Sequence, residues 1–213
     1  GGVALREELP RAYAEWDESK HPRRSAGSED GGEFAPTEDG VSPEAMATIG
    51  RLQEILYPRD TEWFVLVDGR TGKVVYNYSG KEDGVKISTT DLWKMRNNVP
   101  IHNHPNSGSF SSADVYLAIK YGAAEHFVVA RKMNKIYRMQ IAKELRGNVR
   151  LAEVAKTMGP DRKTGYLSET WVQFAKENPG IKYVEEDYGQ KQYAASSFTP
   201  RAAVKWLAQA AFW

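Results

Sequence analysis

The residues of this chain that could do chemistry lie in a short segment, Ile101 to Asp114, with the sequence IHNHPNSGSFSSAD. The chain has four histidines, and two of them, His102 and His104, lie in this segment. At the end of a β-strand, residues i and i+2 point to the same side, so both imidazoles can converge on one ion. Asp114 can supply a third ligand if a helix begins at Ser111, because it then lies in the first turn of that helix. We therefore predict a divalent-metal site formed by His102, His104 and Asp114.

The ligand types indicate which metal chemistry the site would support. The chain has no cysteine, so histidine, aspartate and glutamate are the plausible ligands. Two histidines and one carboxylate leave a coordination position open, as in catalytic rather than structural zinc sites. Zinc in such a site activates water and polarises a carbonyl group. A peptidase also needs a carboxylate that moves a proton and a donor for the developing oxyanion. We therefore expect Zn²⁺ as the cofactor.

The same residues have simpler structural interpretations. Ser111 and Asp114 match a helix-capping pattern, with serine at the N-cap and an acid in the first turn. Capping does not exclude metal binding, although a single carboxylate would not easily serve both roles. An isolated His-x-His pair is more often a hydrogen-bonded pair at a strand end, but Pro105 and the spaced serine and aspartate favour a metal site. We expect His126 to be a structural histidine where a strand begins.

The elements that must position this segment alternate between helix and strand from residue 42 to residue 142. Apolar residues recur at helical spacing after the Ser42-Pro43 cap, and strand-like runs are bounded by turn residues. The expected helices cover residues 42–57, 89–97 and 111–121, and the expected strands cover residues 63–67, 73–78, 99–102, 126–130 and 136–141. This alternation predicts an α/β fold in which helices flank a mixed sheet.

The two ends of the chain differ from this central unit. Residues 1–41 contain a stretch rich in Gly, Pro, Ser and charge, which buries too little apolar surface to offset its ordering entropy. We expect them to form a largely disordered linker or arm. Residues 143–213 have a helical pattern, so we predict a helical C-terminal extension with helices over residues 149–158, 168–177 and 199–213.

Composition limits the classes of partner. The formal net charge is +1, which neither indicates nor excludes a nucleic-acid partner. The chain has no run of 18 apolar residues and no signal-peptide pattern. We therefore expect a soluble protein that does not span a membrane.

The metal-binding segment resembles a known family. HNHP at residues 102–105, followed by SSAD at residues 111–114, is similar to the His-x-His and Ser-x-x-Asp motif of the JAMM/JAB metallopeptidases. The HNHP sequence is closest to the RadC-like branch of that family. TEWFVLVD at residues 61–68 resembles the family's glutamate-bearing strand, and EHFVVARKMNKIYRMQ at residues 125–140 resembles its closing hairpin. The loop Pro105–Phe110 is shorter than in most members.

This resemblance implies a JAMM-like mixed sheet and a zinc-dependent metallopeptidase or isopeptidase acting on a protein or peptide substrate. It implies the following residue roles: zinc held by His102, His104 and Asp114, an oxyanion donor at Ser111, and a catalytic glutamate at Glu62. Glu54 and Glu82 are alternatives for that glutamate.

A second resemblance concerns Trp16 to Pro36, which is similar to a segment of phage Mu F-like minor head proteins. It implies a phage or prophage setting, in the bacterial cytoplasm or in the virion, with phage head proteins as partners. Two other functions stay open. One is a nuclease toxin domain carried by a phage head protein, because HNHP-like loops also occur in nucleases. The other is a non-catalytic JAMM-fold module for virion structure or assembly.

Overall fold

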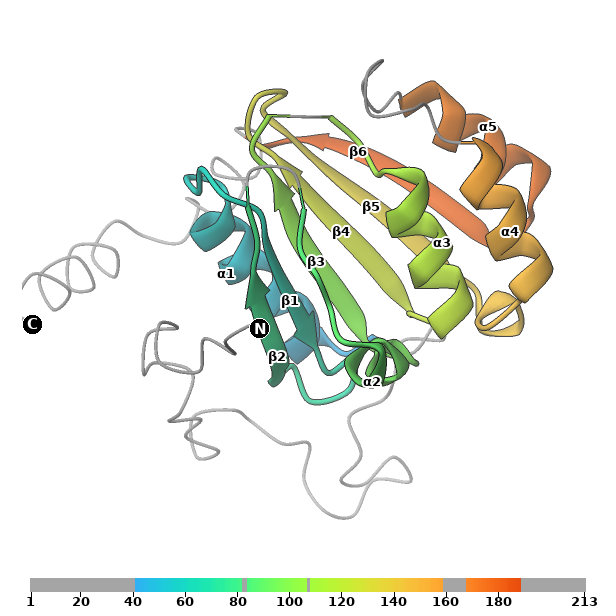
Figure 1. The fold of residues 1–213 in the computed structure, drawn as a ribbon, viewed down its shortest axis with the longest axis horizontal. Helices are drawn as coiled ribbons and strands as arrows, with labels where there is room; N and C mark the ends of the chain where they lie inside the picture. Colours follow the sequence, from blue (N-terminus) through green and yellow to red (C-terminus); the bar gives the residue numbers. More distant parts are fainter. Residues whose placement is uncertain (1–40, 82–83, 107, 159–167, 189–213) are drawn as a thin grey trace, which may run out of the picture.

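The structure, a computed structural model, describes residues 41–81, 84–106, 108–158 and 168–188. These residues form a six-stranded mixed sheet with helices on both faces (Figure 1). The predicted α/β class and the mixed sheet flanked by helices are therefore confirmed. The expected arm, apart from Val41, and the expected helix over residues 199–213 lie outside the described residues.

The strands lie in the order β2-β1-β3-β4-β5-β6. Their bounds are β1 (Trp63–Val67), β2 (Val74–Ser79), β3 (Val99–His104), β4 (Glu125–Ala130), β5 (Lys135–Ile141) and β6 (Ile181–Asp187). All neighbouring pairs are antiparallel except β3 and β4, which are parallel. A parallel pair needs a crossover connection, and the helix α3 (Ser112–Tyr121) forms it. The segment with the predicted metal ligands therefore lies at the end of β3 and the start of this crossover.

The helices cover the sheet unequally. The helix α1 (Pro43–Leu56) packs on one face, and α3, α4 (Val149–Met158) and α5 (Ser168–Glu177) pack on the other (Figure 1). A short helix α2 (Thr89–Leu92) and two 3-10 turns, Trp93–Met95 and Lys143–Leu145, complete the described elements. Alternate residues of β1 divide between the layers, because Val65 packs in the cluster with α1 while Phe64 and Leu66 face the opposite side.

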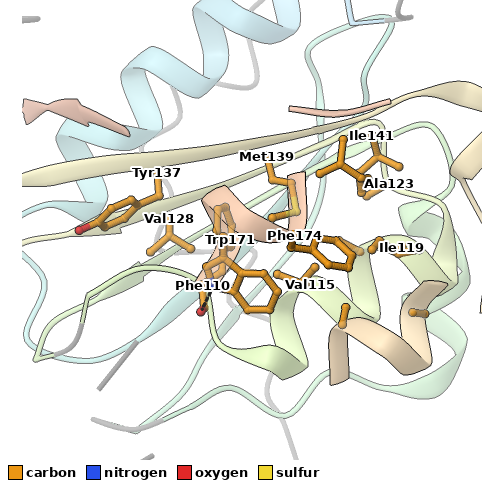
Figure 2. Close-up of a cluster of buried hydrophobic side chains, with 14 of the residues drawn as sticks. Phe110, Val115, Ile119, Ala123, Val128, Tyr137, Met139, Ile141, Trp171 and Phe174 are labelled. Carbon is orange, nitrogen blue, oxygen red and sulfur yellow. Dashed lines mark hydrogen bonds between the residues drawn. The ribbon is translucent and has the colours of Figure 1, made fainter. Parts of the chain in front are cut away.

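The larger core fills the space between the sheet and α3, α4 and α5. Figure 2 shows Phe110, Trp171 and Phe174 packed beneath Tyr137 and Met139 of the sheet. All five side chains are at most 2% exposed. Even-numbered residues of β3 point to this side, so His102 and His104 lie on the same face of the sheet as this core.

The region after residue 142 is not only helical, which corrects the predicted extension. The helices α4 and α5 coincide with predicted helices, but Ile181–Asp187 forms β6, which pairs antiparallel with β5. Its sequence, IKYVEED, is rich in residues with low β-propensity, so its pattern is weak. Charged side chains are common on edge strands because they discourage further pairing. The sheet therefore extends beyond the elements predicted up to residue 142.

No helix among the described residues is long and apolar enough to cross a membrane.

Candidate metal centre

His102 and His104 form the centre of the candidate site. The strand β3 continues to His104, two residues beyond its predicted end, so both side chains lie on one sheet face. Their Nε2 atoms are 2.9 Å apart, and the two residues are 1% and 4% exposed. The Nδ1–H of His104 donates to the carbonyl of Gly108 at 3.0 Å, since a carbonyl can only accept. In neutral His104 this bond places the proton on Nδ1 and the lone pair on Nε2, the atom that faces His102.

Asp114 faces both histidines from the first turn of α3. Its Oδ1 is 3.5 Å from Nε2 of His102, and its Oδ2 is 3.6 Å from Nε2 of His104. The same Oδ2 accepts a hydrogen bond from the N–H of Ser111 at 2.7 Å. Whether this carboxylate serves both as cap and as metal ligand stays a prediction, although capping alone does not use up its oxygens. A carboxylate has about four lone-pair positions, and the capping bond occupies only one of them.

Ser111 is the N-cap of α3, as predicted. Its Oγ accepts a hydrogen bond from the N–H of Asp114 at 3.1 Å, which completes a reciprocal capping box. A hydroxyl that accepts a hydrogen bond keeps its proton for donation elsewhere. Ser111 is thus held next to Asp114 by two bonds, in a position from which its hydroxyl can donate.

Glu62 joins this cluster from the residue before β1. One carboxylate oxygen of Glu62 and one ring nitrogen of each of His102 and His104 lie within 4.8 Å of one another. The antiparallel register places Phe64 opposite His102, so two residues earlier Glu62 lies on the same face near His104. The alternative Glu54 is exposed on α1, which packs on the other side of the sheet, and Glu82 is outside the described residues.

Asn103, between the two histidines, holds the backbone on either side of Glu62. Its Oδ1 accepts a hydrogen bond from the N–H of Trp63 at 2.8 Å, and its Nδ2 donates to the carbonyl of Thr61 at 3.0 Å. The N–H and carbonyl of Glu62 itself pair with the residues just after β2. The main chain that carries the glutamate is therefore held on both sides, although no local sequence pattern predicted this role for Asn103.

A third histidine, His126, contacts the site from β4. Its Nε2 is 3.1 Å from Nδ1 of His102, and the residue is 2% exposed. The parallel register places Ile101 beside Phe127, so His102 and His126 are diagonal neighbours on one face. His126 lies at the start of β4, close to the strand start predicted for it. Its contact with His102 depends on strand pairing that the local sequence does not encode.

The charges in the cluster are uneven. Burial opposes a charge on His102, but Asp114, with a smaller effect from Glu62, raises the pKa of His102 above its ordinary value. Burial and the charge on His102 lower the pKa of His104 to about 4 and that of His126 to about 3. Burial opposes ionisation of Asp114, yet the histidines, His102 first, hold its pKa well below the ordinary value. The ionised Asp114 thus favours the charged form of His102, whereas burial keeps His104 and His126 neutral at neutral pH.

These side chains lie about as close together as the ligands of one divalent cation, with the two Nε2 atoms at hydrogen-bond distance. Donor atoms about 2.1 Å from one tetrahedral zinc ion lie roughly 3.4 Å from each other. The observed separations are 2.9 Å between the two Nε2 atoms, and 3.5 Å and 3.6 Å from these atoms to the Asp114 oxygens. Imidazole and carboxylate donors suit zinc and several other divalent ions, so the donor set does not by itself select one metal. The side chains that together could hold a metal ion are Glu62, His102 and His104, and Asp114 lies beside them with a different oxygen nearest to each histidine.

Two residues from the C-terminal elements hold the loop between the histidines and Asp114. The indole Nε1–H of Trp171 on α5 donates to the carbonyl of Phe110 at 2.7 Å. The hydroxyl of Tyr183 on β6 is 2.7 Å from Oγ of Ser109. Both contacts join residues far apart in the sequence, so they could not be predicted from local patterns. The region after residue 142 thus helps to position the ligands.

Comparisons with known proteins give no relative for this chain: no family model, no curated protein and no solved structure matches it. The resemblance to the JAMM/JAB metallopeptidases therefore stays a prediction that depends on the motif.

Proposed function

We propose that the chain is a zinc-dependent metallopeptidase or isopeptidase of the JAMM type. The observation that supports this most strongly is the convergence of His102, His104 and Asp114, whose donor atoms are separated by 2.9 to 3.6 Å. Glu62 adds a second, half-buried carboxylate at the same place. Two histidines and a carboxylate with a further acid beside them are the groups that zinc-dependent hydrolysis requires.

Each residue has a role in this reaction. His102, His104 and Asp114 would hold Zn²⁺, which lowers the pKa of water and polarises the carbonyl of the substrate. Glu62 takes a proton from the water that attacks the carbonyl carbon and passes it to the departing amine as the C–N bond breaks. Ser111 donates its hydroxyl proton in a hydrogen bond to the oxyanion that forms.

The substrate in this proposal is a protein or peptide. The segment Trp16 to Pro36 lies outside the described residues, and its resemblance to phage minor head proteins supports a phage or prophage origin. We propose phage head proteins as partners, in the bacterial cytoplasm or in the virion.

Metal content of the full chain is the first test. Purified protein should contain about one zinc per chain. His102→Ala should lose this zinc, whereas His21→Ala, which changes a histidine outside the motif, should keep it. Equal zinc content in the wild type and His102→Ala would contradict the site.

Hydrolysis is the second test. The wild type should cleave members of a quenched-fluorescence library of linear and isopeptide-linked substrates, and a zinc chelator should abolish cleavage. In this proposal Asp114 is the third ligand, so Glu62→Gln should keep zinc and lose cleavage. The same preparations should be incubated with RNA and DNA, with and without chelator. Chelator-sensitive degradation of nucleic acid would favour a nuclease, and bound zinc without any hydrolysis would favour a non-catalytic module.

A further inference from the structure

His126 has no part in the reaction proposed above, yet it is built into the site. It lies between two rings, with its centroid 5.0 Å from that of His102 and 5.1 Å from that of Phe110. Its Nε2 is 3.1 Å from Nδ1 of His102, and its side chain is almost completely buried. A histidine placed in this way contacts the side of His102 that faces away from Asp114 and His104.

The hydrogen-bonding capacity of imidazole determines the direction of this contact. To bind an ion, His102 must present the lone pair of Nε2, so its single proton is then on Nδ1. That Nδ1–H donates to Nε2 of His126, which must accept. His104 has the matching arrangement, because its Nδ1–H donates to the carbonyl of Gly108. Each histidine ligand thus has its own acceptor on the far side of the ring.

Charge explains why a neutral acceptor suits this position. A divalent ion together with the carboxylates of Asp114 and Glu62 sums to zero charge. A further carboxylate at position 126 would leave one uncompensated negative charge in a buried region, which is costly. The His126 side chain is almost completely buried, so a neutral ring is the form that this position favours. A neutral imidazole therefore accepts a hydrogen bond from the Nδ1–H of His102 without adding a charge.

We propose that His126 is a positioning residue for metal binding: its Nε2 fixes the tautomer and the ring orientation with which His102 presents Nε2 to the ion. This inference rests on the metal site of the proposed function. Partners of this kind commonly change metal affinity by about 10- to 100-fold when they are removed. A purely structural role for His126 would affect folding and leave the affinity unchanged.

The test uses the full chain and Zn²⁺ itself, with the dissociation constant measured by competition against a chromophoric chelator. His126→Phe keeps a buried ring but has no acceptor, and it should weaken zinc binding about 10- to 100-fold. His126→Gln places an amide oxygen near the position of Nε2 and should recover most of the affinity. His126→Asn is equally polar but too short to reach His102, so it should bind more weakly than His126→Gln.

Val128→Ala is the matched control. Val128 lies beside His102 in the parallel register and is fully buried, but it has no ring nitrogen. It should lower the free energy of unfolding and leave the zinc affinity close to that of the wild type. The Co²⁺-substituted protein gives a second readout, because the visible absorption of Co²⁺ should change in His126→Phe and return in His126→Gln.

The outcomes separate the two proposals. If the wild type binds zinc and all three His126 variants bind it equally well, the positioning role is wrong and the proposed function stands. If His126→Phe does not fold, the comparison of His126→Gln with His126→Asn decides, and equal affinities reject the role. If the wild type binds no zinc, the proposed function fails, and this inference fails with it.

Discussion

The side-chain oxygen of Asn103 accepts a hydrogen bond from the main-chain N–H of Trp63 at 2.8 Å. Continuing the register in which Phe64 lies opposite His102 would place Trp63 opposite Asn103. The side chain of Asn103 therefore makes the hydrogen bond to Trp63 that the main chain of a regular antiparallel pair would make. The amide nitrogen of Asn103 donates to the residue just before Glu62. The residue between the two histidines therefore determines where the glutamate lies relative to them.

Replacing Asn103 should change the position of Glu62 and leave metal binding unchanged. Asn103→Ala leaves the buried N–H of Trp63 and the part-buried carbonyl of Thr61 without this partner, so the free energy of unfolding should fall by about 1–3 kcal/mol in urea denaturation. Zinc content should stay near that of the wild type, because His102, His104 and Asp114 are unchanged. The rate of peptide hydrolysis should fall towards that of Glu62→Gln.

Asn98→Ala is the control for this variant. Asn98 also holds main-chain groups, the N–H of Gly69 at 3.0 Å and the carbonyl of Lys94 at 2.7 Å, but it does not contact the segment of Glu62. It should lose stability and keep hydrolysis. Equal rates in the two variants would show that Asn103 does not position the glutamate.

The parts of the site that could be predicted from the sequence are those set by local geometry. The strand period places His102 and His104 on one face, and the capping pattern places Asp114 in the first turn of a helix. The position of Glu62 beside them was predicted only by resemblance, because it depends on the antiparallel register of β1 and β3.

The parts that could not be predicted depend on contacts between distant segments. His126 meets His102 only because β3 and β4 pair in parallel with a particular register. Trp171 and Tyr183 reach the loop before Ser111 from elements more than sixty residues away along the chain. The strand β6 has a charged sequence with little alternation in its hydrophobicity, so its pairing with β5 decides its structure.

Asp114 should prove to be both a cap and a ligand. In Asp114→Asn the amide oxygen can still accept from the N–H of Ser111, so the helix start is kept. The negative charge is lost, however, and zinc affinity should fall at least about tenfold, which is about 1.4 kcal/mol. The chelator competition assay measures this change. If Asp114→Asn binds zinc with wild-type affinity, Asp114 acts only as a helix cap.

Ser111→Ala provides the opposite change at the same helix end. It removes the acceptor for the N–H of Asp114, which should cost about 1 kcal/mol of stability. Zinc should still bind, since both carboxylate oxygens of Asp114 remain. Hydrolysis should fall because the donor for the oxyanion is lost. An unchanged rate would limit Ser111 to capping.

The hydrogen bond from Trp171 to the carbonyl of Phe110 should matter for metal binding as well as for folding. Trp171→Phe keeps an aromatic ring in the core but removes the N–H donor, which leaves a buried carbonyl without its partner at a cost of about 1–3 kcal/mol. The loop between His104 and Asp114 then loses an anchor, so zinc affinity should fall several-fold in the competition assay.

Phe174→Leu is the matched change in the same core. The ring of Phe174 packs 5.8 Å from that of Trp171, centroid to centroid, and its side chain has no donor for the loop. This variant should lose stability by a similar amount and keep its zinc affinity. If Trp171→Phe and Phe174→Leu both bind zinc as tightly as the wild type does, the hydrogen bond from the indole of Trp171 contributes only to folding.

Zinc affinity should rise with pH, because His102 must lose the proton on Nε2 before it can bind an ion. Asp114 raises the pKa of His102 above 6.5, so this proton is present over the whole range below that value. In that range the dissociation constant should fall up to about tenfold for each pH unit gained. His104, with a pKa of about 4, and His126, with a pKa of about 3, are already neutral above pH 5 and add no slope there. Competition assays from pH 5.5 to 8.5 should therefore show zinc affinity that rises with pH, with a slope of one proton at least up to pH 6.5. A constant affinity between pH 5.5 and 6.5 would show that His102 carries no proton for zinc to displace.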